Sequence, residues 1–231
     1  MKKLKKILLV AATEAEIAPF LAKARLTPIG YYQHTYHIGT FADHHLSVLI
    51  TGAGILSTAF ALGNLLSRDH FDVVLHAGIA GSFSEQYPIG SVVQIVTDSL
   101  GDAGAEDHEQ FIPLSQLPFF DANAFPFQNG QLHNPQPQTF AVAAALPQVS
   151  GITVNAVSGC ERTIALRKNI FAADIETMES AALFYACLWH DIPFCSLRSI
   201  SNIITPRNTA EWQIPLAIER LEECLVRCLE D

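Results

Sequence analysis

Two glutamates follow the first apolar run of the chain, where a carboxylate could do acid–base chemistry. The run at residues 7–12 predicts a β-strand, and Glu14 and Glu16 come directly after it. A carboxylate at a strand end that faces a ligand crevice could act as a general base. Carboxylates that open a helix also stabilise the positive end of its dipole, by about 0.3–1 kcal/mol each. Both interpretations of this pair stay open.

Glu179 and Asn202 are two further polar residues in apolar surroundings. Glu179 lies in the first turn of a predicted helix that is apolar nearly all round and must therefore be buried. A buried carboxylate needs a partner, which could be sugar hydroxyls or the backbone of the helix start. Asn202 ends the last predicted strand, where its amide could bind a ring nitrogen and an exocyclic oxygen of a purine. The alternative for Asn202 is a residue that caps or turns the chain.

Two predicted strands run directly into glycine-rich segments, at residues 51–54 and 76–82. In an open α/β sheet, ligands bind at the carboxyl ends of the strands, and a glycine such as Gly78 lets the backbone approach a ligand. Turns without a ligand are the alternative. The spacing Gly52-x-Gly54-x-x-Ser57 departs from the dinucleotide motif, and Asp72 precedes a strand instead of ending one, so NAD binding is not favoured.

The elements that must position these residues alternate between short apolar runs and longer helical patterns. We predict strands at 7–12, 46–51, 73–77, 92–97, 152–157 and 194–200, and helices at 15–24, 55–68, 161–168, 178–189 and 210–229. This alternation predicts an α/β protein, a three-layer α/β/α sandwich with a central mixed, largely parallel sheet. We expect a single domain over residues 1–231, with a hairpin at 31–45 and a long loop at 99–137 that is functional or part of an interface.

Composition narrows the class of partner. Hydrophobic residues make up 49% of the 231 residues and charged residues only 16%, against about 25% in typical domains. This excludes a disordered chain and indicates a large core or an oligomer that covers part of its surface. The net charge of −9 has the wrong sign for a nucleic-acid binder. Small molecules are therefore the expected partners.

The start of the chain and its cysteines bear on localisation. Residues 1–12 imitate a secretory signal, but Glu14 and Glu16 follow at once without a cleavage site. No apolar run approaches the ~20 residues that a membrane helix needs. The five cysteines form no C-x-x-C pair and no zinc pattern, which indicates reduced thiols. We expect a cytoplasmic protein without a membrane partner or a metal.

Five segments, taken in order along the chain, resemble the nucleoside phosphorylase/nucleosidase superfamily, in particular its methylthioadenosine/S-adenosylhomocysteine nucleosidase branch. They are residues 12–17, 51–54, 76–81, 178–179 and 198–202. Within the superfamily, residues 101–107 and 178–182 are similar to the futalosine hydrolase subfamily, although Ser180 stands where that subfamily usually has glycine.

The resemblance implies a role for each matching residue. Glu16 would deprotonate an attacking water, Glu179 would hold the ribose 2′- and 3′-hydroxyls, and Met178 would pack beneath the sugar. Asn202 would bind the purine at nitrogen 7 and oxygen 6. Adenine-specific relatives carry Asp at that position, so Asn202 predicts a preference for 6-oxopurines.

Four more residues are expected at the substrate with less defined roles: Gly78, Arg198, Ser201 and His76. Arg198 would order the water or only pair with a buried acid, and His76 would touch the ligand or only pack. Because a substrate of this subfamily carries a carboxylate and the chain is acidic, a local cation is needed. Arg162 and Arg207 are candidates, with surface solvation as the alternative.

The resemblance therefore implies a homo-oligomeric nucleoside hydrolase without a cofactor. It would release hypoxanthine from futalosine, in the alternative route to menaquinone. Glu16 would repel phosphate, which favours hydrolysis over phosphorolysis. A methylthioadenosine/S-adenosylhomocysteine nucleosidase and a non-catalytic nucleoside-binding protein are the alternatives.

Overall fold

The computed structural model describes residues 4–31, 34–108 and 110–231. Its strands are β1 (Lys6–Ala11), β2 (Thr27–Tyr31), β3 (His34–Phe41), β4 (His44–Ile50), β5 (Val73–Ser82), β6 (Val92–Leu100), β7 (Gly104–Asp107), β8 (Gln110–Pro113), β9 (Gln131–His133), β10 (Gln148–Thr153), β11 (Ile175–Thr177) and β12 (Phe194–Ile203). Its helices are α1 (Glu14–Ala24), α2 (Ile55–Leu66), α3 (Ala141–Ala144), α4 (Glu161–Phe171), α5 (Ser180–Trp189) and α6 (Ile214–Glu230), with short 3₁₀ turns η1 (Leu114–Gln116) and η2 (Thr209–Glu211).

Ten strands form one mixed sheet in the order β11-β10-β6-β12-β5-β1-β4-β3-β2, with β9 beside β6. Parallel pairs occupy its centre, since β1 runs parallel to β4 and β5, and β5 runs parallel to β12. β6 runs antiparallel to β12. β11 pairs with β10 and also with the end of β5, so this half of the sheet curls back on itself.

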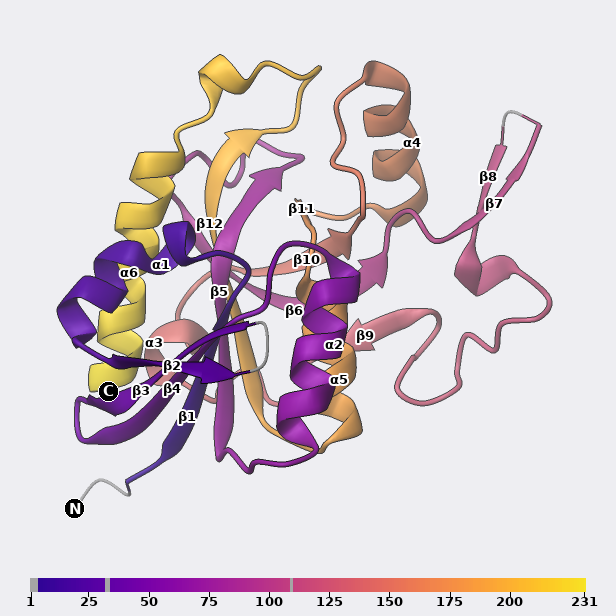
Figure 1. The fold of residues 1–231 in the computed structure, drawn as a ribbon. Helices are drawn as coiled ribbons and strands as arrows, with labels where there is room; N and C mark the ends of the chain where they lie inside the picture. Colours follow the sequence, from indigo (N-terminus) through magenta and orange to yellow (C-terminus); the bar gives the residue numbers. More distant parts are fainter. Residues whose placement is uncertain (1–3, 32–33, 109) are drawn as a thin grey trace.

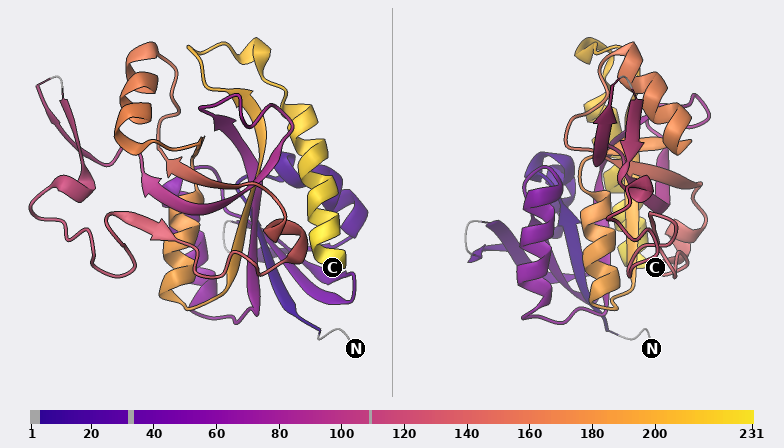
Figure 2. Two further views of the ribbon diagram at one scale, coloured as in Figure 1. Left: turned by 180° about the vertical axis from the view of Figure 1, so that it is seen from behind. Right: turned by 90° about the vertical axis from the view of Figure 1, so that its right-hand side faces the viewer.

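Helices cover both faces of the sheet and complete three layers (Figures 1 and 2). Helices α2 and α5 pack on one face, over a core that includes Leu62 and Phe184. Helices α1, α3 and α6 cover the other face, over a core that includes Phe20 and Leu225. The central strands read as continuous apolar runs because both of their faces are covered. The predicted α/β/α sandwich with a mixed sheet is confirmed.

Several elements have bounds that differ from those the sequence pattern predicts. β6, β12 and α4 each continue for three residues beyond the predicted end, and α6 begins four residues later than predicted, at Ile214. β5 continues through Gly78 and Gly81 as far as Ser82, where we expected an irregular turn, because β12 stays paired with it. β10 begins at Gln148 and ends at Thr153, so residues 154–157 lie outside the strand that we predicted there. Helix α5 begins at Ser180, two residues later than predicted.

The two segments that break the alternation have structure of their own. The predicted hairpin corresponds to β3 and β4, which pair from Phe41↔His44 outward, although residues 32–33 of the predicted range lie outside the described residues. The predicted long loop holds the β7–β8 hairpin, η1 and β9. Figure 1 shows the β7–β8 hairpin projecting away from the sandwich.

Candidate functional site

Glu16 is held at the start of α1 by contacts on both of its carboxylate oxygens. Its Oε2 accepts hydrogen bonds from the backbone N–H and the hydroxyl of Thr13, both at 3.0 Å. Its Oε1 accepts from the backbone N–H of Ile79 in β5, at 3.1 Å. Glu16 therefore caps its own helix and also faces the strand, so the two interpretations of this residue are not exclusive.

Gly78 lies between Glu16 and Arg198. A Cβ built on Gly78 would lie 2.9 Å from Glu16 Oε1 and 3.5 Å from Arg198 Cζ. Its backbone is extended within β5, so the reason for glycine here is close approach and not a left-handed conformation. Any side chain at this position would therefore clash with the carboxylate of Glu16 and contact the guanidinium of Arg198.

Glu179 is the buried N-cap residue of α5, and its side chain does not cap its own helix. Its Oε1 instead accepts a hydrogen bond from the backbone N–H of Gly54, at 2.9 Å, in the turn before α2. Burial raises the pKa of Glu179, the Gly54 N–H and Arg198 oppose this rise, and the Glu16 charge adds to it. The sequence predicted burial correctly but placed Glu179 inside the helix.

Arg198 lies in the interior of β12 with only 1% of its surface exposed. It donates from Nη1 to the carbonyl of Leu197 at 2.8 Å and from Nη2 to Ser180 Oγ at 3.1 Å. Its Nε has no acceptor among the residues that the structure describes. This nitrogen lies on the Gly78 side, since a Cβ on Gly78 would lie 3.6 Å from it.

His76 lies beneath Arg198 and is equally buried. Its ring nitrogens are 2.8 and 3.0 Å from Arg198 Nη2, and its Nδ1 is 3.2 Å from Ser196 Oγ. Burial lowers the pKa of His76 well below its usual value, and the charge of Arg198 lowers it further. A neutral imidazole can accept from the guanidinium. These contacts support Arg198, and a contact between His76 and a ligand stays a prediction.

Asn202 and Ser201 lie farther along β12, beside Gly81. The hydroxyl of Ser201 lies 2.9 Å from Asn202 Oδ1 and 3.1 Å from the carbonyl of Ala80. Asn202 Nδ2 is 3.3 Å from the carbonyl of Ile203. Because Ser201 holds the amide oxygen, the nitrogen is the atom that Asn202 presents as a donor.

The spacing along β5 relates the two ends of the candidate site. Glu16 contacts the strand at Gly78 and Ile79, while Asn202 pairs with Gly81. Three residues of extended strand span roughly 10 Å. A purine nucleoside with its hydrogen-bond partners fits this separation, with the sugar near Glu16 and the base near Asn202.

The remaining predicted residues lie around this site. Met178 is half-buried in the turn between β11 and α5, directly before Glu179, and its packing against a sugar stays a prediction. Arg162 lines a cavity of about 530 Å³ between α4 and the β7–β8 hairpin. Arg207 follows β12 and lies 5.3 Å from the ring centre of Trp212. Binding of a substrate carboxylate by Arg162 or Arg207 stays a prediction.

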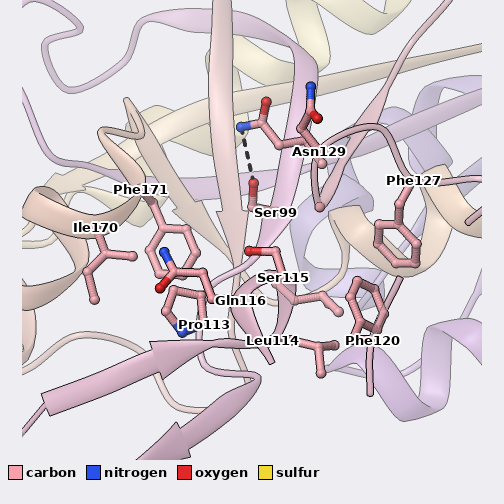
Figure 3. Close-up of a pocket in the computed structure, with 13 residues that line it drawn as sticks. Ser99, Pro113, Leu114, Ser115, Gln116, Phe120, Phe127, Asn129, Ile170 and Phe171 are labelled. Carbon is pink, nitrogen blue, oxygen red and sulfur yellow. Dashed lines mark hydrogen bonds between the residues drawn. The ribbon is translucent and has the colours of Figure 1, made fainter. Parts of the chain in front are cut away.

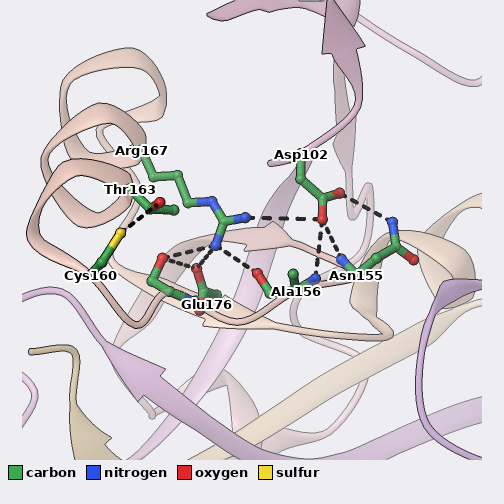
Figure 4. A network of polar contacts seen from close by, with 8 residues as sticks. Asp102, Asn155, Ala156, Cys160, Thr163, Arg167 and Glu176 are labelled. Atoms are coloured by element: carbon green, nitrogen blue, oxygen red, sulfur yellow. Dashed lines mark hydrogen bonds and ion pairs between the residues drawn. The ribbon is translucent and has the colours of Figure 1, made fainter. Parts of the chain in front are cut away.

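A buried ion network beside the site was not anticipated from the sequence (Figure 4). Arg167 in α4 donates to Glu176 at 2.8 Å, and Glu176 accepts from the backbone N–H of Ser158 at 2.7 Å. Asp102 accepts from the backbone N–H of Asn155 at 2.6 Å. The network ties the start of the segment 99–137 to the loop before α4. Its members look like exposed charges in the sequence, so only their three-dimensional positions reveal it.

The segment 99–137 also encloses a small cavity, outside the candidate site (Figure 3). Gln131 donates to Ser99 Oγ at 3.4 Å on one side, and Phe120, Phe127 and Phe171 line it. Its volume is about 140 Å³. Ligand pockets for molecules of nucleoside size occupy about 300–1,000 Å³, so this cavity is too small for such a ligand.

Within residues 4–31, 34–108 and 110–231, no three or more His, Cys, Asp or Glu side chains are placed to hold a metal ion. Over the same described residues, none of the helices has the length and apolar character needed to cross a bilayer.

The α/β/α fold with its mixed sheet is the fold of solved nucleosidase structures. A family model described as the phosphorylase superfamily matches residues 6–230. The chain therefore belongs to the phosphorylase superfamily, which confirms the resemblance predicted from its sequence.

Curated relatives carry two activities in their names. A futalosine hydrolase of Streptomyces coelicolor is 32% identical over 67% of this chain, and the chain spans 64% of that relative's length. A futalosine hydrolase of Acidothermus cellulolyticus is 32% identical, over 76% of this chain and 71% of the relative. A 5'-methylthioadenosine/S-adenosylhomocysteine nucleosidase of Colwellia psychrerythraea is 28% identical, over 84% and 82%.

Solved structures share the fold at lower identity. A futalosine hydrolase mutant of Helicobacter pylori superposes with a TM-score of 0.82 at 18% identity, covering 98% of this chain and 99% of the other. The Colwellia psychrerythraea nucleosidase, solved in complex with adenine, superposes with a TM-score of 0.78 at 22% identity, covering 98% and 95%.

Proposed function

We propose that this chain is a futalosine hydrolase, which cleaves the N-glycosidic bond of futalosine and releases hypoxanthine and dehypoxanthine futalosine. The observation that carries the proposal is Glu16, held by the Ile79 N–H and close to Gly78 at one end of a site whose other end presents the amide of Asn202. The relatives named futalosine hydrolase support it. The proposal includes a single catalytic domain over residues 1–231, in the cytoplasm, serving the alternative route to menaquinone.

Glu16 performs the first part of the proposed reaction. The oxygen of a water forms a bond to carbon 1′ of the ribose, and Glu16 takes the proton that this water loses. The Arg198 Nε–H, which lacks an acceptor among the described residues, is available to orient the water. The neighbouring carboxylates of Glu16 and Glu179 also stabilise the positive charge that develops on the sugar.

Asn202 stabilises the other product of bond cleavage. As the bond between carbon 1′ and nitrogen 9 breaks, its electron pair moves onto the purine. The purine anion takes up a proton from solvent to give hypoxanthine, and Glu16 gives the proton that it took from water back to solvent. Asn202 Nδ2 donates hydrogen bonds to nitrogen 7 and oxygen 6, where this negative charge collects. Ser201 keeps the amide in the orientation that presents Nδ2. These groups supply the stabilisation that the step requires without a metal or redox group.

A substrate panel tests the proposal. Purified protein is incubated with futalosine, methylthioadenosine and inosine, with and without phosphate, and the released bases are separated and quantified. We expect hypoxanthine release from futalosine that does not depend on phosphate. A strict phosphate requirement would exclude hydrolysis. A far higher kcat/KM for adenine release from methylthioadenosine would exclude futalosine as the substrate of this chain.

The alternative enzyme is a 5'-methylthioadenosine/S-adenosylhomocysteine nucleosidase, which the relative of that name from Colwellia psychrerythraea favours. The two activities differ in the purine that leaves, hypoxanthine or adenine. A non-catalytic nucleoside-binding protein has no need of a carboxylate held at the sugar end, so the contacts of Glu16 argue against it.

Replacement of Asn202 by aspartate tests base recognition. A carboxylate accepts hydrogen bonds from a 6-amino group but repels oxygen 6, so Asn202→Asp should shift the ratio of kcat/KM toward 6-aminopurine nucleosides. We expect a shift of about tenfold or more, since an unpaired buried polar group costs about 1–3 kcal/mol and about 1.4 kcal/mol is tenfold. The ratio is measured with futalosine and aminofutalosine. An unchanged ratio would remove Asn202 from base recognition.

We also propose that two copies of this chain associate through α2 and α5. Between these helices lies an apolar groove of about 550 Å³, and exposed large side chains flank it: Leu56 (82% exposed), Phe60 (65%) and Trp189 (58%). A contiguous apolar patch of this kind marks an association surface. A second copy fits it because only 16% of the residues are charged, a composition typical of an oligomer that covers part of its surface.

Light scattering on a sizing column tests this association. We expect the wild type at twice the 25.2 kDa of one chain, and the double variant Phe60→Ser, Trp189→Ser shifted toward one chain mass. Ile170→Ser, an exposed apolar residue on α4 away from the groove, serves as the matched control and should stay dimeric. A wild type that elutes at one chain mass would contradict the proposal.

A further inference from the structure

Asp98 is a carboxylate buried in the interior beneath the candidate site, and the mechanism above does not use it. It lies in β6 with no exposed surface. Its Oδ1 accepts a hydrogen bond from Thr153 Oγ1 at 2.7 Å, while its Oδ2 has no partner among the described residues. A Cβ built on Gly151 would lie 2.6 Å from Oδ2, so β10 passes directly against the carboxylate. Burying an incompletely paired carboxylate lowers the stability of the fold, so we expect Asp98 to have a function that offsets this loss.

The contacts of Thr153 link Asp98 to the first turn of α5. The N-cap residue Glu179 turns its side chain away, to Gly54, so other groups must satisfy the first amides of the helix. The N–H of Ala181 donates to Thr153 Oγ1 at 2.8 Å. Because the Thr153 hydroxyl gives its proton to Asp98, its lone pairs are free to face this amide. Asp98 thus fixes the group that replaces the missing helix cap.

The same contacts continue to Arg198. Thr153 Oγ1 lies 3.2 Å from Thr177 Oγ1, and Thr177 donates to Ser180 Oγ at 2.9 Å. Ser180 Oγ also accepts from Arg198 Nη2 at 3.1 Å. Buried side chains therefore form one continuous path from Asp98 to Arg198, which passes through the first turn of α5, directly after Glu179.

The electrostatic interaction between Asp98 and Arg198 is consistent with the path of contacts that joins them. Burial raises the pKa of Asp98 to about 7, and the Thr153 hydrogen bond and the charge of Arg198 limit this rise. Burial lowers the pKa of Arg198, and the charges of Glu179, Glu16 and Asp98 oppose that fall. The charge of Asp98 is thus one of those that oppose the fall in the pKa of Arg198.

We propose that Asp98 is a positioning residue: through Thr153 it holds the first turn of α5 and Ser180 in place, and thereby fixes Glu179 and Arg198 against the nucleoside. The catalytic part of this inference rests on the proposed function, whereas the structural part does not. Misplacement of reacting groups by about 1 Å can cost about a hundredfold in rate, so even small shifts of α5 should be measurable.

Two readouts on one set of variants test the proposal. Asp98→Asn keeps the size of the side chain but removes its charge, so the Thr153 hydroxyl is left with a neutral and weaker acceptor. Thr153→Val removes the linking hydroxyl that Thr153→Ser retains. We expect Asp98→Asn and Thr153→Val to lower kcat about tenfold or more with a smaller change in KM. Thr153→Ser should restore more than half of kcat. Amide hydrogen exchange at Ala181 should be about tenfold faster in the two impaired variants, and not in the middle of α5.

Asp174→Asn is the matched control. Asp174 accepts from Ser150 Oγ at 2.9 Å, a carboxylate–hydroxyl contact to the same strand β10 but away from α5. The variant Asp174→Asn should lower Tm without changing kcat or the rate of amide hydrogen exchange at Ala181. Unchanged exchange in Asp98→Asn would overturn the proposal, as would faster exchange with full kcat. If the wild type cleaves no nucleoside, the proposed function fails, and exchange at Ala181 alone then decides whether Asp98 holds α5.

Discussion

Replacing Glu16 by glutamine is expected to lower kcat for futalosine hydrolysis at least about a hundredfold, the usual scale for losing a positioned acid–base group. Glutamine can still accept the Ile79 N–H or the Thr13 contacts through its amide oxygen, so the start of α1 and its approach to β5 are largely retained. What is lost is the ability to take a proton from water. The change should therefore appear in kcat, measured by hypoxanthine release, while KM and Tm change little.

Glu14→Gln supplies the matched control for this result. Glu14 opens the same helix two residues earlier, and its Oε1 is 3.3 Å from His37 Nε2. It carries the same charge into the same helix dipole but does not contact β5 through any described hydrogen bond. We expect Glu14→Gln to keep kcat within about twofold. Equal losses in the two variants would mean that helix capping, and not proton transfer, explains the importance of Glu16.

The sequence predicted the position of Glu16 because the signal is local. An apolar run followed by two acids gives a strand end and a helix start, and these alone bring a carboxylate to the edge of the sheet. The sequence could not show that Gly78 makes room for Glu16 and Arg198 together. Both approach one backbone position from distant parts of the chain, at Cβ distances of 2.9 and 3.5 Å. We expected a turn there because glycine usually marks one, but strand pairing with β12 overrides that preference.

The contact between Asp98 and Thr153 could not be predicted from the residues that neighbour each of them in the sequence. Thr153 lies in a predicted apolar strand and Asp98 directly follows one, and an acid in such a place is a signal that something must pair with it. The partner is 55 residues away along the chain, and the α5 amide that Thr153 caps is 28 residues beyond that. Helix α5 illustrates the same limit. Its apolar character predicted burial, but its first residue is set by caps that come from β10 and β11 and not by the helix's own sequence.

Replacing Glu179 by glutamine is expected to lower kcat/KM at least about a hundredfold. The new side chain in Glu179→Gln can accept the Gly54 N–H through its amide oxygen, so the contact between α5 and the turn before α2 remains. An amide cannot accept from two ribose hydroxyls as a carboxylate does, because its nitrogen is a donor only. The substitution also removes the negative charge beside Arg198 that favours the developing sugar cation.

The 2′-deoxy analogue of futalosine separates ribose binding from a general loss of structure. If Glu179 accepts from the 2′-hydroxyl, the wild type should lose activity on the analogue, and Glu179→Gln should lose little more.

The pH profile gives an independent check. Burial raises the pKa of Glu179, so protonation removes its acceptor function nearer to neutrality than for an exposed glutamate. The kcat/KM of the wild type should therefore fall as pH decreases through that range, and the fall should move to lower pH in Glu179→Gln. An unmoved acid limb, together with equal losses on both substrates, would assign Glu179 to folding alone.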